Sequence, residues 1–486
     1  MIKLTFRQIS MLFIATGLGI AGDAESDVVA AGDDASLAEP RNDWAAHLLP
    51  IPGVDKETAR LFGALREALG VQALDEAEVD AKQLVTQVMT RFAGNLVLRC
   101  RTLHDLAVVQ HLRAEYPAAI RNYRESIDVI SDSQDMLSAE LVEPLHGLGI
   151  AYADSGDPVA AFRTFERARH ISNVNQGPHS LAQVPLLQSI VRLHEDQGDL
   201  QSAEDALARI YQLHLRAYSA DAEELLPVLR QQAGLYKRHG MLDKEYEAWN
   251  EVLHILRKHL GKNDLALVEP QLSLGRNMIK RMAHVKFSSG PTAPSAEKYL
   301  KRALAIAMHN PRANWQIQRR AMLALADYYM LLGAPARGRR YYALTWRLLT
   351  DNKQFTQRVA DLDANVPLFE PRPNPYANFE YNPDLEKIDP ADYQSGLMVA
   401  EFTINKRGHT QDVEIVEQNP PDFQRMQWRL TKSLRGFVFR PRFVDGKAVS
   451  TDKYQYRLEY YYLPSEYRAS LATSGRLNRP HPPEYH

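Results

Sequence analysis

Small or apolar residues recur at a spacing of 42 residues through about half of the chain. They are Ala107, Gly149, Val191, Ala233 and Gly275. Two further columns keep the same step, Ala114, Gly156, Gly198 and Gly240 seven residues later, and Tyr123, Phe165, Leu207 and Trp249 sixteen residues later. A fixed period of this size is the signature of stacked supersecondary units. Because such arrays usually bind other molecules and leave them chemically unchanged, the period constrains both fold and function.

Residues 144–171 show what one unit contains. Two runs of apolar residues have helical spacing, namely Leu145, Leu148 and Tyr152 in the first and Ala161, Phe165 and Ile171 in the second. Between them Gly156-Asp157-Pro158 breaks the chain, and the proline suits the first turn of a second helix. Each unit is therefore predicted to be helix, turn, helix. One such pair cannot bury its own apolar face, so the pairs must stack.

The order of residue types in this unit resembles the tetratricopeptide repeat. The pattern of small residue, aromatic, turn glycine, alanine, large apolar residue and alanine is met by Gly149, Tyr152, Gly156, Ala161, Phe165 and Ala168. The resemblance implies a mainly α solenoid of about six such repeats over residues 96–350, with residues 25–95 as an N-terminal helical region or cap. The usual period is about 34 residues, so a HEAT-type array, with its longer repeats, is the structural alternative.

The later units follow the same pattern with one interruption. The fifth unit carries an insertion that starts at His284, after which the pattern resumes at Ala296, Leu300 and Ala303. A sixth unit fits the columns with Ala326, Tyr329, Gly333, Gly338 and Tyr342.

Residues 1–24 have the composition of a secretory signal peptide. Lys3 and Arg7 precede an uncharged stretch of 15 residues, Gln8 to Gly22, and small residues follow it. We therefore expect cleavage after Ala21 or Ala24 and a periplasmic location. Because a membrane-spanning helix needs about 20 apolar residues, this stretch is short. An uncleaved anchor in the inner membrane is the alternative.

Composition excludes several classes of site. Cys100 is the only cysteine, so the chain forms no intramolecular disulfide and no cysteine metal cluster. A formal net charge of -2 shows no basic bias of the kind that nucleic-acid binding requires. The chain has no HExxH, GxSxG or phosphate-loop motif. We therefore expect no enzyme, no cofactor, no metal site and no small-molecule substrate.

Helical periodicity ends near residue 350 and a different organisation follows. Prolines then gather in a stretch with little apolar periodicity, at Pro367, Pro371, Pro373, Pro375 and Pro383. Such a composition is typical of an extended, semi-rigid connection. Residues 351–384 are therefore predicted to be a linker, and residues 465–486, at the other end of the next domain, a disordered tail.

Residues 385–464 are predicted to form a small α+β domain. Period-two alternation at Met398, Ala400, Phe402 and Ile404 predicts a strand, and Val413 and Ile415 mark a returning one. Helical spacing relates Phe423, Met426, Leu430 and Leu434. Strict alternation returns at Tyr454, Tyr456, Leu458, Tyr460 and Tyr462. The predicted order is strand, strand, helix, strand.

This region resembles the C-terminal domain of the TonB family. The resemblance is carried by Phe402-Thr403-Ile404, Gly408, Asp412-Val413, Phe439-Arg440-Pro441 and Asp445-Gly446-Lys447. In that family the domain meets outer-membrane receptors, partly by adding its strand to a receptor segment. Here a repeat array stands where the family has a spacer, and the apolar N-terminal segment has the features of a cleavable signal. The resemblance therefore implies binding to a protein or another envelope component more than energy transduction.

The tetratricopeptide resemblance also implies a binding groove on the first helix of each unit. Carried over by position, its basic residues are Arg192, Arg230, Lys237 and Arg276, and Lys280 lies beside the last of these positions. Such a groove would suit an acidic peptide or a terminal carboxylate, which arginine binds in a bidentate manner. The alternative is a solvated helix face with scattered charges.

A second candidate surface lies in the C-terminal domain. Arg425, Arg429 and Lys432 share one helical face, and Arg440 and Arg442 are near in sequence. These charges would suit anionic envelope material or an acidic partner. The alternative is the soluble outer face of an ordinary helix.

Together these features predict a periplasmic adaptor. Its repeat groove would bind one protein and its TonB-like domain would dock on another envelope component, such as an outer-membrane protein. The mechanism is tethering without chemistry, and neither nucleic acid nor a small-molecule substrate is expected. The alternative function is that of a TonB-type energy transducer, or of a transport accessory, held at the inner membrane by an uncleaved N-terminal segment.

Overall fold

The computed structural model describes residues 48–132, 136–285, 293–370 and 393–465. The chain divides into two compact units, one ending at Gly198 and the other beginning at Asp199. The predicted signal peptide lies outside the described residues, as does nearly all of the predicted tail.

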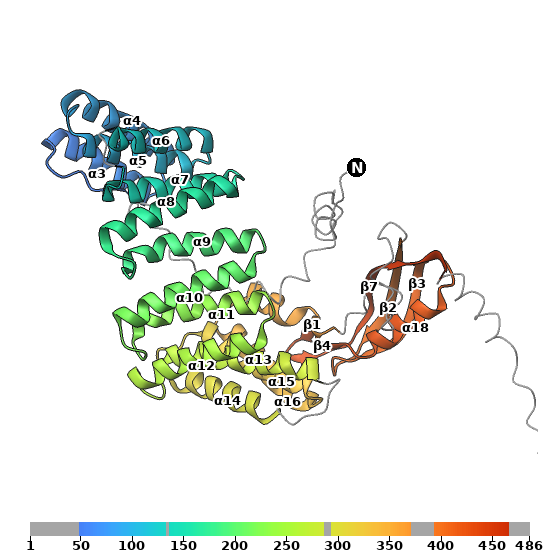
Figure 1. Ribbon diagram of the computed structural model, residues 1–486. Coiled ribbons are helices and arrows are strands. Elements are labelled where there is room, and N and C mark those ends of the chain that lie inside the picture. Colours follow the sequence, from blue (N-terminus) through green and yellow to red (C-terminus); the bar gives the residue numbers. More distant parts are fainter. Residues whose placement is uncertain (1–47, 133–135, 286–292, 371–392, 466–486) are drawn as a thin grey trace, which may run out of the picture. The chain divides into compact units, whose positions relative to one another are not determined.

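The first unit consists of consecutive helices (Figure 1). Its helices are α3 (Lys56–Gly70), α4 (Leu74–Arg91), α5 (Leu96–Leu112), α6 (Tyr116–Ser131), α7 (Val142–Asp154), α8 (Pro158–Gln176) and α9 (Val184–Asp196). The pair α3 and α4 lies within the region predicted to be an N-terminal helical region or cap. Its buried side chains share a core with Leu98, Leu106 and Val109 of α5.

The second unit continues the same organisation. Its helices are α10 (Leu200–Ala217), α11 (Leu226–Arg238), α12 (Leu242–His259), α13 (Val268–Val285), α14 (Ala293–His309), α15 (Trp315–Leu331) and α16 (Pro335–Asp351). Single turns of 3-10 helix precede four of the first helices, at Ala139–Leu141, Leu181–Gln183, Glu223–Leu225 and Leu265–Leu267, and they keep the 42-residue step. The predicted helix–turn–helix repeats and mainly α fold class are confirmed.

The column of small residues marks the places where paired helices approach most closely. A methyl group added at Gly149 would lie 2.3 Å from Cε1 of Phe165, and one added at Gly275 would lie 2.5 Å from Cδ2 of Leu300. The aromatic or large apolar residue on the second helix therefore packs directly on the backbone of the first. Leu300 takes this place after the insertion, where the sequence pattern predicted that the repeat resumes.

The residues at the turn between paired helices are mostly glycine, and their backbone conformation explains why. Gly156, Gly198 and Gly240 all have positive φ, between 66° and 86°. This left-handed conformation closes the end of the first helix and suits glycine, which has no Cβ to clash. Ala114 holds the same place in the second pair with a φ of 59°, at the cost of some backbone strain.

Tyrosines on first helices bond to charged side chains of the preceding second helix. Within the first unit, Arg124 donates from Nε to the Tyr152 hydroxyl at 2.9 Å. Within the second, the Tyr329 hydroxyl donates to Glu297 at 2.7 Å and that of Tyr236 donates to Glu204 at 3.3 Å. Burial, with Glu204 nearby, raises the pKa of Tyr236 to about 12. The tyrosine rings fill the space between successive helix pairs, and their hydroxyl hydrogen bonds connect the pairs.

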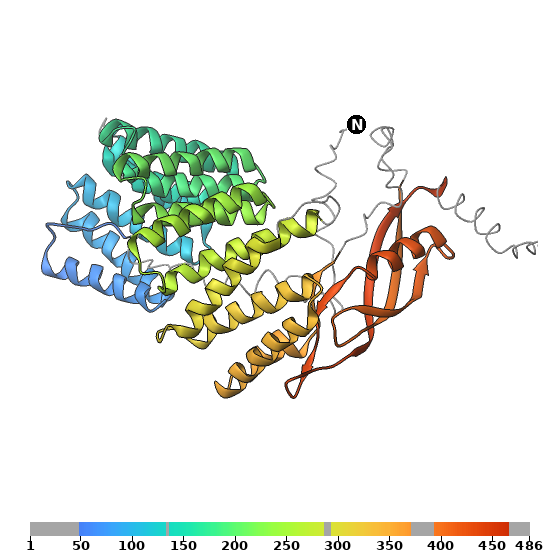
Figure 2. The same ribbon diagram turned by 90° about the horizontal axis from the view of Figure 1, so that it is seen from below.

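The C-terminal domain is a three-stranded antiparallel sheet covered by one helix (Figure 2). Its main elements are β2 (Gln394–Ile404), β3 (Thr410–Asn419), α18 (Gln424–Leu434) and β7 (Thr451–Tyr462), with the strand order β3-β2-β7. Short strands β4 (Val438–Arg440), β5 (Phe443–Val444) and β6 (Lys447–Ala448) precede β7. Met398, Phe402, Leu430 and Leu434 belong to one core, so the predicted order and faces are confirmed.

The predicted linker is wrong in its described part. After α16 the chain forms α17 (Phe355–Arg358), a π-helical turn at Val359–Asp363 and strand β1 (Val366–Phe369). β1 pairs with β4 in antiparallel fashion, with Val366 opposite Arg440. Proline-rich sequence is compatible with a strand at a sheet edge, where one side of the backbone needs no partner. Residues 371–392 of the predicted linker lie outside the described residues.

Two glycine-to-alanine substitutions in the first unit should separate helix propensity from packing. Gly63, in α3, has nothing within 4 Å of an added methyl group, so Gly63→Ala should stabilise the unit by about 1 kcal/mol. Gly149→Ala gains the same propensity but must displace the buried Phe165 ring, so it should be less stable than Gly63→Ala by about 1–3 kcal/mol. Urea unfolding followed by circular dichroism measures both. Equal shifts would show that the close approach at Gly149 is not a constraint.

Candidate functional site

The last helix pair and the C-terminal domain share a hydrophobic core. Its buried members from the helix pair and the segment after it are Leu323, Ala326, Met330, Tyr342, Leu349 and Leu362, and those from the domain are Val438 and Phe443. The rings of Tyr342 and Phe443 meet edge to face, with centroids 5.7 Å apart. The domain is therefore packed against α15 and α16, and Figure 2 shows the red strands beside these orange helices.

Arg440 crosses this junction, and its predicted place on the domain surface is wrong. It is only 9% exposed, and its guanidinium makes a bidentate pair with Asp327 of α15. The two N···O distances are 3.1 Å from Nε and 2.8 Å from Nη2. Nη1 donates to the main-chain oxygen of Asp361 at 2.9 Å. In sequence Arg440 stands near exposed cations, but the fold turns it toward the repeat array.

Asp327 is the centre of a polar cluster within the junction. Besides Arg440 it accepts a hydrogen bond of 2.6 Å from the hydroxyl of Tyr342. Burial, helped by Asp327, raises the pKa of Tyr342 well above its usual value. Burial is the largest single influence on Arg440 and would lower its pKa, but Asp327, Tyr342 and Asp361 together outweigh it and the pKa is raised. Arg319 of α15 adds an ion pair with Asp361 at 2.6 Å.

Three residues at this junction occupy the groove positions of their repeat. The candidate groove positions are counted from the small residue of each unit. They lie three residues before it, one residue after it and four residues after it. In the last pair, whose small residue is Ala326, these are Leu323, Asp327 and Met330. Leu323 and Met330 belong to the shared core, and Asp327 binds Arg440. The chain's own C-terminal domain therefore covers the groove positions of the last repeat.

The predicted groove residues of the second unit lie on α11 and α13. Arg230 is half-buried, and its Nε lies 3.6 Å from Oε2 of Glu269, which connects the two helices. Arg276 is half-buried as well, whereas Lys237 and Lys280 are exposed. This surface is basic, but Glu269 offsets part of its charge.

Arg192 lies in the first unit and is also accompanied by acids. Its side chain is 72% exposed and stands 3.7 Å from Asp154 and 3.9 Å from Asp196. His111 of α5 approaches the same Asp154 at 3.1 Å. Sequence reasoning missed Asp154 and Glu269 because it selected only the basic residues at and beside the groove positions.

The candidate residues of the C-terminal domain fall into two groups. Arg425 and Lys432 are exposed on α18 and Arg429 is half-buried there, so these three share a helix as predicted. Arg442 belongs instead to the junction, where its main-chain N–H donates to Asn365 at 3.2 Å. Sequence reasoning missed Trp428, which is 62% exposed on α18 beneath the Lys432 ammonium, 4.7 Å from the ring centre.

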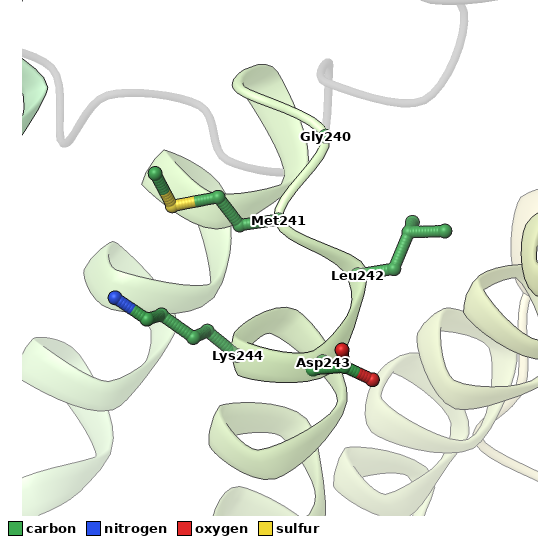
Figure 3. A pocket seen from close by; sticks show the side chains of 5 residues that line it. All are labelled: Gly240, Met241, Leu242, Asp243 and Lys244. Atoms are coloured by element: carbon green, nitrogen blue, oxygen red, sulfur yellow. The ribbon is translucent and has the colours of Figure 1, made fainter.

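A hollow of about 510 Å³ opens at the turn between α11 and α12, lined by residues 240–244 (Figure 3). The charged groups at this turn are already paired. Lys244 binds Glu204 at 2.7 Å, and Asp243 lies 2.7 Å from Arg281. The main-chain oxygen of Leu242 accepts hydrogen bonds from Asn277 and Arg281. The hollow therefore presents no pair of unengaged groups set up for acid–base or nucleophilic chemistry.

Two further observations concern metals and membranes. In the part of the chain that the structure describes, no cluster of three or more His, Cys, Asp or Glu side chains is placed to hold a metal ion. Across the same residues, no helix combines the length and the apolar character needed to cross a membrane.

Comparisons with known proteins give no family for the chain. No family model matches it, and no curated protein matches it. Among solved structures, TPR-like repeats of a putative kinesin light chain from Podosopora anserina have a TM-score of 0.36 at 17% identity, covering 44% of this chain and 97% of that one. BtubC from P. vanneervenii has a TM-score of 0.38 at 18% identity, covering 50% and 94%.

The apo form of the quorum sensor NprR from B. thuringiensis is a third similar structure. It has a TM-score of 0.34 at 12% identity and covers 63% of this chain and 86% of that chain. With TM-scores below 0.5, these likenesses identify neither a family nor a ligand for this chain. They do not include a TonB C-terminal domain, so that resemblance stays a prediction.

Removal of Arg440 should release the C-terminal domain from the repeat array. Arg440→Ala leaves Asp327 partly buried without its bidentate partner, which should cost about 3–5 kcal/mol. Hydrogen exchange should then rise in β1 and β4, while the core of β2 and β7 stays protected. Arg457→Ala, an exposed residue of β7, is the control and should change neither. If the amide protons of β1 and β4 stay equally protected in Arg440→Ala, the ion pair of Arg440 with Asp327 does not hold the domain on the repeat array.

Proposed function

We propose that this chain is a protein-binding scaffold whose first-helix positions recognise segments of polypeptide. The observation that carries the proposal is the junction at the last repeat. There a polypeptide segment, β4 with the residues around it, already occupies Leu323, Asp327 and Met330. The contact combines apolar burial with one bidentate charge pair, which gives both affinity and orientation.

The equivalent positions on α11 and α13 are the proposed site for a partner. Arg276 holds the place of Asp327, and Ile279 holds that of Met330. On α11 the corresponding residues are Arg230, Gly234 and Lys237. An extended segment that carries carboxylates fits this basic surface by charge, as β4 with its arginine fits Asp327.

The C-terminal domain supplies a second surface at a fixed place beside the last repeat. Its junction face is already used, which leaves the edge strands β3 and β7 for a protein partner. The TonB-like sequence pattern supports docking on an envelope protein, including an outer-membrane protein. The signal-like N-terminus supports a periplasmic location. An inner-membrane transducer is the second candidate function. It requires that the apolar segment from Gln8 to Gly22 stays uncleaved.

Deleting the C-terminal domain would be a poor test of this proposal. It would expose Leu323, Met330 and Leu349, and the new apolar surface would capture proteins without specificity. Photo-crosslinking from single positions of the full chain avoids this problem. A crosslinker at Gly234 should capture a partner from bacterial envelope extract, whereas one at Asn250, exposed on the second helix α12, should not. Equal capture from both positions would contradict recognition by the first helices.

Charge reversal tests the basic surface directly. Arg230→Glu together with Arg276→Glu should reduce capture at Gly234 at least tenfold, because like charges across an interface cost several kcal/mol. Arg230→Glu removes a partly exposed ion pair and sets a like charge beside Glu269, so circular dichroism must first show that the double variant keeps its helical fold. Matched controls are Arg209→Glu and Arg216→Glu on α10. Undiminished capture by the double variant would remove these arginines from the site.

A further inference from the structure

One stripe of α18 carries cations around an exposed tryptophan. Arg425, Trp428 and Lys432 of α18 and Arg435, which caps the end of the helix, follow one another at intervals of three and four residues, and all four are exposed. These intervals place side chains on one side of a helix. The opposite side, with Met426, Leu430 and Leu434, is buried in the domain core. The stripe therefore forms the outer ridge of the domain above its sheet.

The charged side chains of the ridge all have the same sign. Residues 423–435 contain four cationic side chains and no acidic one. Trp428 is 62% exposed, which is unusual for the largest amphipathic side chain of proteins. Lys432 lies 4.7 Å from its ring centre, so the indole and the cation present one combined surface. Asp422, one residue before the segment, is the nearest acid in sequence.

We propose that this ridge rests on an anionic lipid surface, with Trp428 at the headgroup level. Indole rings favour the membrane–water interface, because one part of the ring is apolar and its N–H is polar. Each cation near an anionic surface contributes about 1 kcal/mol, which is about a fivefold gain in affinity. A convex ridge with a single tryptophan suits a broad, flat surface better than it suits a peptide, which needs a groove to bury its side chains.

The proposal does not depend on the protein-binding scaffold. A ridge with three exposed cations and one aromatic side chain gives weak, reversible attachment, far from that of a membrane-spanning helix. Attachment of this strength would hold the domain near an envelope membrane while leaving the repeat surface on α11 and α13 open to a partner.

Vesicle cosedimentation of the full chain tests the inference. Binding to vesicles of phosphatidylglycerol and phosphatidylcholine should exceed binding to phosphatidylcholine alone, and added salt should weaken it. Arg425→Gln with Lys432→Gln should reduce the partition coefficient about 25-fold, at about fivefold for each cation. Lys406→Gln with Arg457→Gln removes the same charge from the turn after β2 and from β7, and should leave the partition unchanged.

Tryptophan fluorescence supplies a second readout. Vesicles of phosphatidylglycerol should shift the emission of the chain to shorter wavelength, and Trp428→Phe should abolish the shift while retaining most of the charge-dependent binding. Equal loss in the two double variants would overturn the proposal, since the binding would then follow net charge. Absence of vesicle binding would overturn it too, including the case in which poly-glutamate binds the ridge and lipid does not.

Discussion

The second unit depends on one buried guanidinium. Taking Arg440 out of water is costly, and the fold offsets that cost with a bidentate carboxylate, a main-chain oxygen and a tyrosine ring. Its partner Asp327 is fixed in turn by the Tyr342 hydroxyl. Because the Asp327 carboxylate binds both Arg440 and the Tyr342 hydroxyl, these three groups favour one register between the C-terminal domain and α15. An apolar junction without the pair would tolerate sliding, so the charges specify the geometry and the surrounding core stabilises it.

The repeat array owes its regularity to a different constraint, the close approach of helix backbones. A glycine at positions such as 149 and 275 lets a ring or a branched side chain lie directly on the first helix. The turn glycines fix where each helix ends, and the tyrosines connect one pair to the next. These requirements leave the outward positions of first helices free to vary. That freedom explains how equivalent positions carry arginine in α13 and aspartate in α15.

Features that repeat locally could be predicted from the sequence, and features that join distant segments could not. The residue types in the 42-residue columns and the alternation from Met398 to Ile404 are set by which side chains of one helix or strand are buried. They therefore predicted the helices and strands. Arg440 and Asp327 are 113 residues apart, and neither carries a local sign of its partner. Strand β1 was missed because its four residues lie among prolines and pair with β4, which is about 70 residues away in the sequence. Trp428 was missed because an exposed aromatic breaks no helical pattern.

Packing of the domain on the last repeat would change what a scaffold of the proposed kind can do. A domain on an extended linker would sample many positions, and the effective concentration of one partner near the other would follow linker length. Here the junction replaces that freedom with a fixed separation between the proposed repeat surface on α11 and α13 and the ridge of α18. A protein on the proposed repeat surface and a membrane on the ridge would then be held in one relative geometry, and only a protein whose site matches it could bind while the ridge is attached. Specificity would arise from this spacing as well as from the contacts of either surface alone.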